Sequence, residues 1–287
     1  MHWQCCHHRL NIGTEPLIMG ILNTTPDSFS DGGRFVSVDA ALARGREMLA
    51  AGANIIDIGG ESTRPGADPV DVETECLRVL PIIEALAAET GAVISVDTMK
   101  ARVAREALRC GAVIVNDVSG MVADPDMTGV VRETGAGVIL MHMPGTPQTM
   151  QAHAHYGSVV DDVALWLASR LSDTLASGIA AEAIAIDPGI GFGKTTDHNL
   201  SLIAQLDWLG ELGCPILVGV SRKRFIGELS GVTVADQRLA GSLAALTCAV
   251  LHGAHILRVH DVSESRQAAL VAAALRRSGR VGKGSRV

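Results

Sequence analysis

Short apolar runs rich in Val and Ile alternate along the chain with longer segments whose apolar residues recur at helical spacing. The apolar runs predict eight strands, at 17–23, 54–59, 93–98, 113–118, 137–142, 183–187, 215–220 and 255–260. The segments between and after them predict helices at 38–51, 71–89, 99–110, 125–134, 158–177, 198–212, 234–252 and 264–277. Strands that alternate with helices pair in parallel, because a parallel partner is reached through a long crossover.

A glycine separates several predicted helices from the strands that follow them. Gly52 precedes the run 55–58, Gly111 precedes 113–115, and the pattern recurs at Gly91, Gly135 and Gly178. Glycine just past a helix adopts the left-handed conformation that ends the helix without a Cβ clash. Eight such units in 287 residues fit one closed barrel, which typically needs about 250 residues. The predicted fold is α/β, a single (β/α)8 TIM barrel.

No linker or change in composition divides the chain. We therefore expect an N-terminal extension at 1–16, one barrel at 17–277 and a basic, flexible tail at 278–287. Hydrophobic residues make up 47% and aromatic residues only 3%, so the barrel core must be aliphatic. Runs of Val and Ile are typical of parallel strands that are buried on both faces.

The net charge of −7 changes the range of partners to consider. It argues against nucleic acid, since no basic stripe stands out against it. No apolar stretch reaches the ~18 residues of a membrane span, and the first run, 17–22, is too short for a signal peptide. The six cysteines form no CxxC pair. We expect a cytoplasmic protein that acts on small molecules and binds no membrane.

Polar side chains follow the apolar runs directly, at the predicted C-terminal strand ends. Active sites of parallel barrels form at those ends, where the strands converge and the loops are free to vary. The pattern predicts one shared pocket, lined by Asn23, Asp57, Glu61, Asp97, Asn116, Asp117, His142, Asp187, Ser221, Arg222, Lys223, Arg258 and His260.

Three of these strand-end residues suit a flat heterocycle that is rich in hydrogen-bond donors. One carboxylate, such as Asp97 or Asp187, can accept two adjacent N–H groups of a 2-aminopyrimidinone ring. Asn116 can both donate and accept. The alternative is that an Asp at a strand end only caps the following helix. This alternative has more weight for Asp97 than for Asp187.

A cationic group, formed by Arg64, Lys223, Arg258 and His260, favours a substrate that carries phosphate. The alternative for any single Arg is a surface ion pair. Arg258 and His260 alternate on one short strand and so point the same way. Two loops rich in hydroxyl, Gly and Pro residues, 23–33 and 59–66, are typical of lids that move over a site, although ordinary connectors remain the alternative.

Seven motifs in the same order resemble dihydropteroate synthase and cover residues 17–262. They are NTTPDSF at 23–29, GGESTRPG at 59–66, DT at 97–98, NDVSG at 116–120, DPGIGFGK at 187–194, SRKRFIG at 221–227 and RVHDV at 258–262. This family joins 6-hydroxymethyl-7,8-dihydropterin pyrophosphate to p-aminobenzoate, giving 7,8-dihydropteroate and pyrophosphate in folate synthesis. The family is a sulfonamide target.

The resemblance also implies roles for individual residues. The pterin would be held by Asp97, Asn116, Asp187, Phe192 and Lys223. The pyrophosphate would be bound by Asn23, Arg64, Arg258 and His260, with Mg2+ as cofactor on Asn23. The p-aminobenzoate pocket would be formed by Phe29, Thr63, Pro65, Ser221 and Lys223. Catalysis would rest on Asp97, Asp187, Lys223, Arg258 and His260, in a homodimer.

Other functions stay open at this stage. A methyltetrahydrofolate-dependent methyltransferase resembles the family in its pterin site but has no use for the lid motifs. A lysine-dependent aldolase would use Lys223 as a Schiff base. A catalytically silent barrel would bind pterin without turnover. Arg224 stands where many family members carry Ser, which affects the expected contact with the p-aminobenzoate carboxylate.

Overall fold

Eight parallel strands form a barrel in the computed structural model, which describes residues 1–24 and 38–281. The sheet order is β8-β7-β6-β5-β4-β3-β10-β9, and a parallel bridge from Ile186 to Ile216 closes it. The strands are β3 (Leu17–Asn23), β4 (Ile55–Gly59), β5 (Val93–Asp97), β6 (Ile114–Asp117), β7 (Gly137–Met141), β8 (Ile184–Asp187), β9 (Leu217–Val218) and β10 (Ile256–Val259). The predicted (β/α)8 barrel is confirmed.

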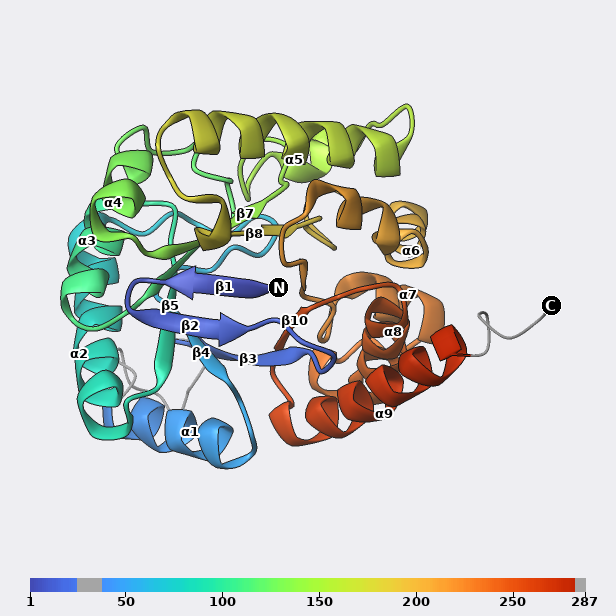
Figure 1. Ribbon diagram of the computed structural model, residues 1–287, viewed down its shortest axis with the longest axis horizontal. Coiled ribbons are helices and arrows are strands. Elements are labelled where there is room, and N and C mark those ends of the chain that lie inside the picture. The colour runs from blue at the N-terminus through green and yellow to red at the C-terminus, as the bar shows by residue number, and fades with distance from the viewer. Residues whose placement is uncertain (25–37, 282–287) are drawn as a thin grey trace.

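Helices surround the barrel, as Figure 1 shows. They are α1 (Val38–Ala50), α2 (Val72–Thr90), α3 (Ala101–Arg109), α4 (Met127–Thr134), α5 (Val159–Ala176), α6 (Thr196–Ala204), α7 (Arg224–Ser230), α8 (Leu239–Leu251) and α9 (Val262–Val281). An aliphatic cluster fills the space between these helices and the strands. None of the described helices is long and apolar enough to span a membrane.

Two helix ends follow the predicted glycine rule. Gly91 (φ 61°) and Gly135 (φ 67°) are left-handed, and their N–H groups donate to Ala87 O and Val131 O. Such bonds satisfy carbonyls that the end of a helix would leave unpaired. The chain then turns directly into β5 and β7, as the sequence predicts.

Three helical segments differ from the prediction. The segment 198–212 is interrupted at Gln205, where α6 gives way to a 3-10 turn, Leu206–Leu212. Helix α8 begins at Leu239 rather than 234, after a 3-10 turn at Ala235–Gln237. Helix α7 was not predicted, because seven residues are too few to display a helical period.

An N-terminal hairpin covers one end of the barrel. Strands β1 (His2–Cys5) and β2 (His8–Asn11) pair antiparallel and cross in front of the barrel strands in Figure 1. Trp3, Cys5 and Ile12 are buried against the first residues of the barrel strands. Trp3 Nε1 donates to Ala183 O at 2.9 Å. The hairpin therefore seals the N-terminal end of the barrel and leaves the C-terminal end for chemistry.

Candidate active site

A charged cluster lies at the C-terminal ends of four barrel strands. Arg258 of β10 donates from Nε to Asp57 Oδ2 of β4 at 2.6 Å and from Nη2 to Asp97 Oδ2 of β5 at 2.7 Å. Asn116 Nδ2 of β6 donates to the same Asp57 oxygen at 3.1 Å. Parallel pairing sets Asp97 beside Asn116 in register, so adjacent strands bring these groups together.

Two carboxylate oxygens of this cluster have no partner within the described part of the chain. Asp57 Oδ1 and Asp97 Oδ1 are buried and accept no hydrogen bond. A buried acceptor without a donor costs free energy, so such atoms in a folded protein call for an explanation. A ligand that supplies N–H donors would provide one.

Asp187 of β8 and Lys223 lie next to this cluster. Asp187 is buried, and its Oδ1 accepts from the Gly189 N–H at 2.7 Å. Lys223 places its ammonium 4.0 Å from the centre of the Phe192 ring, a cation–π contact. Burial and the nearby Arg258 lower the pKa of Lys223 to about 8, while Asp187 and Asp97 oppose that fall. The pterin residues predicted from the motifs are thus brought to one place.

Two carboxyls in the site titrate near neutrality. Burial raises the pKa of Asp97 to about 7, opposed by Arg258 and reinforced by Asp57. Burial also raises the pKa of Asp187 to about 6, opposed by the Gly189 N–H and Lys223. Strongly shifted groups gathered in one location are typical of a functional site.

His260 and Ser221 form a pair at the edge of the cluster. His260 Nδ1 and Ser221 Oγ are 3.0 Å apart, and the His260 N–H donates to the same oxygen at 3.3 Å. Burial, Arg222 and Arg258 lower the pKa of His260 to about 3. The imidazole is therefore neutral rather than the cation expected from sequence, and it can offer a phosphate a hydrogen bond but no charge.

The turn that carries Ser221 and Lys223 is held by the residue between them. Arg222 has a left-handed backbone (φ 60°), which is unfavourable for a residue with a Cβ. Its guanidinium donates to Asp261 Oδ2 at 3.1 Å and to Oδ1 at 2.6 Å, and its N–H donates to Ser242 Oγ at 2.9 Å. Strained residues of this kind persist where their surroundings hold them, commonly at functional sites.

The loop after β4 lies beside the loop after β7. Gly66 N–H donates to Pro147 O at 3.1 Å, and Gln148 Nε2 donates to Ala67 O at 2.8 Å. Thr63 on this loop is half-buried, whereas Arg64 and Pro65 are exposed. The charge of Arg64 reaches the site, since it helps to lower the pKa of Lys223. The predicted p-aminobenzoate contact Phe29 lies outside the described residues.

Asn23, the predicted Mg2+ ligand, is half-buried at the end of β3. Its Oδ1 lies 3.8 Å, and Asp97 Oδ2 3.6 Å, from the position that a Cβ on Gly59 would occupy. Within residues 1–24 and 38–281, no group of three or more His, Cys, Asp or Glu is placed to hold a metal ion. A single protein ligand such as Asn23 is enough for a Mg2+ ion whose other ligands are phosphate oxygens and water, as is common for Mg2+.

Sequence reasoning assigned no role to Asp57 and left His142 and Lys194 without one. Asp57 is fully buried and joins Arg258 to Asn116. The sequence signal for Asp57 was its place within the apolar run 55–58. Its bonding partner could not be predicted, because that partner depends on strand register. Lys194 and His142 form a buried pair 3.0 Å apart beside the site.

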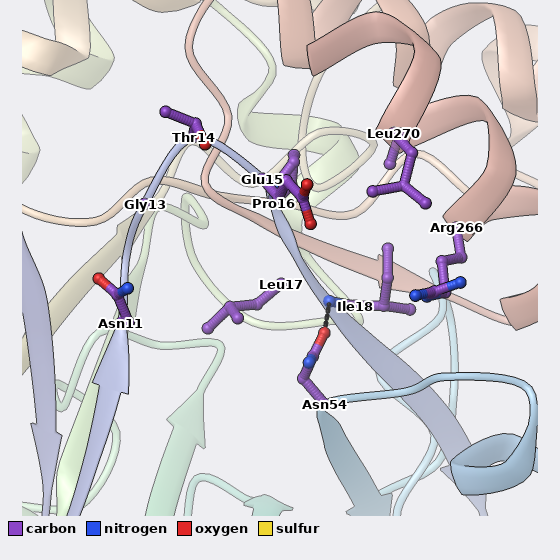
Figure 2. A pocket seen from close by; sticks show the side chains of 11 residues that line it. Asn11, Gly13, Thr14, Glu15, Pro16, Leu17, Ile18, Asn54, Arg266 and Leu270 are labelled. Atoms are coloured by element: carbon purple, nitrogen blue, oxygen red, sulfur yellow. Dashed lines mark hydrogen bonds between the residues drawn. The ribbon is translucent and has the colours of Figure 1, made fainter. Parts of the chain in front are cut away.

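The pocket in Figure 2 lies at the opposite, N-terminal end of the barrel. It has a volume of about 330 Å³ and lies between the start of β3 and α9. Asn54 Oδ1 accepts the Ile18 N–H there at 2.8 Å. None of the predicted site residues that the structure describes lines this pocket, so the site assignment rests on the charged cluster.

Comparisons with known proteins show the family of the chain. The family model for pterin binding enzymes matches residues 19–260. A dihydropteroate synthase from Synechocystis is 46% identical over 92% of this chain and 91% of its own length. The Escherichia coli dihydropteroate synthase is 47% identical over 89% of this chain and 90% of its own. This chain belongs to the dihydropteroate synthase family.

Solved structures of the family share the fold closely. Xanthomonas albilineans dihydropteroate synthase with 4-aminobenzoic acid has a TM-score of 0.89 at 46% identity and covers 96% of this chain and 98% of its own. A Yersinia pestis dihydropteroate synthase in complex with a sulfonamide drug has a TM-score of 0.90 at 42% identity, covering 97% of this chain and 100% of its own. The Xanthomonas enzyme has also been solved with 7,8-dihydropteroate.

Proposed function

We propose that this chain is a dihydropteroate synthase. It condenses 6-hydroxymethyl-7,8-dihydropterin pyrophosphate with p-aminobenzoate to form 7,8-dihydropteroate and pyrophosphate. The proposal rests on the charged cluster of buried carboxyl, amide and cationic groups at the C-terminal strand ends. The chain that carries this cluster is 46% identical to a dihydropteroate synthase. The family membership favours this reaction, and the charged cluster supplies acceptors for a pterin and cations for a pyrophosphate.

The pterin half of the substrate is assigned to Asp97, Asn116, Asp187 and Lys223. A pterin ring presents adjacent N–H donors, and the unpartnered Asp97 Oδ1 and the buried Asp187 carboxylate are acceptors for them. Asn116 can donate or accept beside them. Phe192 supplies an apolar ring that Lys223 already contacts.

The pyrophosphate is assigned to Asn23, Arg64, Arg258 and His260. A guanidinium has five N–H donors, and the bonds from Arg258 to Asp57 and Asp97 use two, so it can also donate to a phosphate oxygen. Mg2+, held by Asn23 and phosphate oxygens, would neutralise charge on the leaving group. The p-aminobenzoate is assigned to Phe29, Thr63, Pro65, Ser221 and Lys223.

The chemical step breaks the bond from the pterin methylene carbon to the pyrophosphate oxygen and forms a bond from that carbon to the aryl amine. The amine then loses one proton to water or to the released pyrophosphate. The dihydropterin ring can delocalise positive charge at the methylene, so we propose a largely dissociative displacement that the nearby carboxylates stabilise. An aryl amine is neutral at pH 7 and needs no strong base. The protein's task is to orient the amine and exclude water.

The direct test is an assay with dihydropterin pyrophosphate, Mg2+ and labelled p-aminobenzoate. Labelled dihydropteroate should form, and EDTA should abolish its formation. Pterin binding without product would contradict the proposed reaction and favour a silent pterin-binding barrel or a methyltransferase. Isotope effects at the methylene that indicate a tight, associative transition state would contradict the dissociative step alone.

Three further properties are proposed on family grounds. The chain forms a homodimer, which light scattering of the purified protein tests directly. It is inhibited by sulfonamides that compete with p-aminobenzoate, which steady-state kinetics at varied p-aminobenzoate would reveal. A cytoplasmic location stays a prediction.

A further inference from the structure

Lys194 is a buried lysine beside the site that the assigned roles leave unused. Its side chain is only 5% exposed. The ammonium lies 3.0 Å from His142 Nδ1, donates to Phe192 O at 3.0 Å and approaches His142 O at 3.4 Å. An ammonium has three N–H donors, and these are three acceptors. Lys194 therefore links the end of β7 to the loop that follows β8.

The environment of Lys194 is unusual for a buried cation. Among the described residues its three hydrogen-bond partners are an imidazole and two carbonyls rather than a carboxylate, although Asp187 is close enough to favour its charge. Burial lowers the pKa of Lys194 to about 7. Burial and Lys194 lower the pKa of His142 to about 3, so its imidazole is neutral and Nδ1 can accept. Because its pKa lies near 7, the amine is charged in only part of the molecules at neutral pH, and burying such a polar group is costly, so its retention calls for a function.

The two linked loops approach each other unusually closely. A Cβ on Gly189 (φ 68°) would lie 2.0 Å from His142 O, and one on Gly193 (φ 57°) would lie 2.4 Å from Pro144 Cγ. Only glycine fits both the backbone conformation and the space. The loop of residues 187–194 thus rests directly on the end of β7, where Lys194 fastens it.

This loop carries two of the groups assigned to the pterin. Asp187 begins it, and Phe192, whose carbonyl accepts from Lys194, places its ring under Lys223. A change in the carbonyl position of Phe192 moves the ring that forms one wall of the pterin pocket. The positive charge of Lys194 also favours the ionised form of the Asp187 carboxyl and so opposes the rise of its pKa.

We infer that Lys194 is a positioning residue for the pterin substrate. By joining His142 to the Phe192 carbonyl, it holds Phe192 and Asp187 in the arrangement that receives the ring. The inference rests on the proposed function for the identity of the ligand, but the pterin-binding measurement that decides it does not require turnover.

The test is equilibrium binding of 6-hydroxymethylpterin, followed by the fluorescence of the pterin, to the wild type and to Lys194→Met. We expect the dissociation constant to rise about tenfold or more, since the variant loses charge-assisted hydrogen bonds that hold the pocket. The KM for p-aminobenzoate should change less than the pterin affinity, because Lys194 acts on Lys223, which both pockets share, only through the Phe192 ring. Lys194→Gln, which keeps a donor without the charge, should recover part of the affinity and remains informative if Lys194→Met folds poorly.

Tyr156→Phe is the matched control. The Tyr156 hydroxyl donates to Gly193 O at 2.9 Å, so this variant loosens the same loop without touching Phe192 or Asp187. It should lower the melting temperature yet leave pterin affinity within about twofold of the wild type. Equal pterin affinity in all variants, with only their melting temperatures reduced, would overturn the inference. A wild type that binds pterin but forms no product would overturn the proposed function and leave this comparison valid.

Discussion

The two ends of the same eight strands are built from opposite kinds of residues. At the N-terminal end, Trp3, Cys5 and Ile12 of the extension pack on Ile55 and Ile114 in an apolar cluster. At the C-terminal end, the same strands present carboxylates and a guanidinium joined by hydrogen bonds of 2.6 and 2.7 Å. Strands β4 and β6 therefore change from apolar to polar within a few residues.

The difference shows how a barrel separates stability from chemistry. Apolar burial contributes to folding in proportion to area and needs no partner of fixed geometry. Buried charges cost free energy and are retained where they serve binding or catalysis. Substitutions at the N-terminal end should therefore change stability alone, whereas those at the other end should change activity, and stability as well where they leave a buried charge without its partner.

The largest effect is expected from Arg258→Met, because it leaves Asp57 and Asp97 buried without their cation. Removing one partner of a buried ion pair typically costs about 3–5 kcal/mol of unfolding free energy. Turnover should also disappear. Denaturant unfolding at pH 8 measures the loss, which should shrink at pH 5, where Asp97, whose pKa burial raises to about 7, takes up a proton. Arg258→Lys is the control, since it keeps a positive charge but not the forked geometry of the guanidinium. Its unfolding free energy should lie between those of the wild type and Arg258→Met. An unchanged unfolding free energy in Arg258→Met would contradict the account.

Trp3→Ala tests the other end. The indole is fully buried, so its truncation should cost about 3–5 kcal/mol of unfolding free energy. The ratio kcat/KM per folded molecule should stay within about twofold, because Trp3 packs at the N-terminal end of the barrel, away from the charged cluster. Trp3→Phe retains most of the apolar volume and should cost less. A selective loss of kcat/KM in the folded fraction would show that the two ends are coupled.

A change in pH should have a smaller effect, on pterin binding. The pKa of Asp187 is raised from its ordinary 3.8 to about 6, and the carboxylate must be ionised to accept pterin N–H groups. Pterin binding should therefore strengthen as pH rises through 6, with a further gain near 7, where Asp97, the other assigned acceptor, loses its proton. The proton on Asp187 alone should weaken binding by up to about tenfold for each unit below 6. The folded state holds this proton more tightly than the unfolded state, so the same carboxyl makes the protein less stable as pH rises from 3.8 to 6. Titration of pterin fluorescence between pH 5 and pH 8 measures the binding limb, and a flat profile would contradict it.

Most of the barrel could be predicted from the sequence, because buried parallel strands and glycine-ended helices leave strong local patterns. The hairpin of β1 and β2 could not. Trp3 and Cys5 alternate with polar residues, and their burial depends on a barrel end formed by distant strands. Helix α7 was too short for its periodicity to be read.

The residue types of the site could also be predicted, since strand ends converge in a barrel. Their pairing could not, because the bond between Asp57 and Arg258 joins residues 201 positions apart. The neutral state of His260 likewise depends on burial and on Arg222 and Arg258. Lys194 lies in a predicted motif, but only the approach of β7 shows what its ammonium holds.

Asp187→Asn tests the separation of chemistry from stability most directly. Asparagine has the same shape, and its oxygen can still accept from the Gly189 N–H, but it lacks the charge and the second acceptor. We expect kcat/KM for dihydropteroate formation to fall by about a thousandfold, as two charged hydrogen bonds to the pterin are lost. The free energy of unfolding at pH 8 should stay equal to that of the wild type or rise, because a buried charge has been removed. Unchanged turnover, or a loss of stability large enough to explain the loss of activity, would contradict the account.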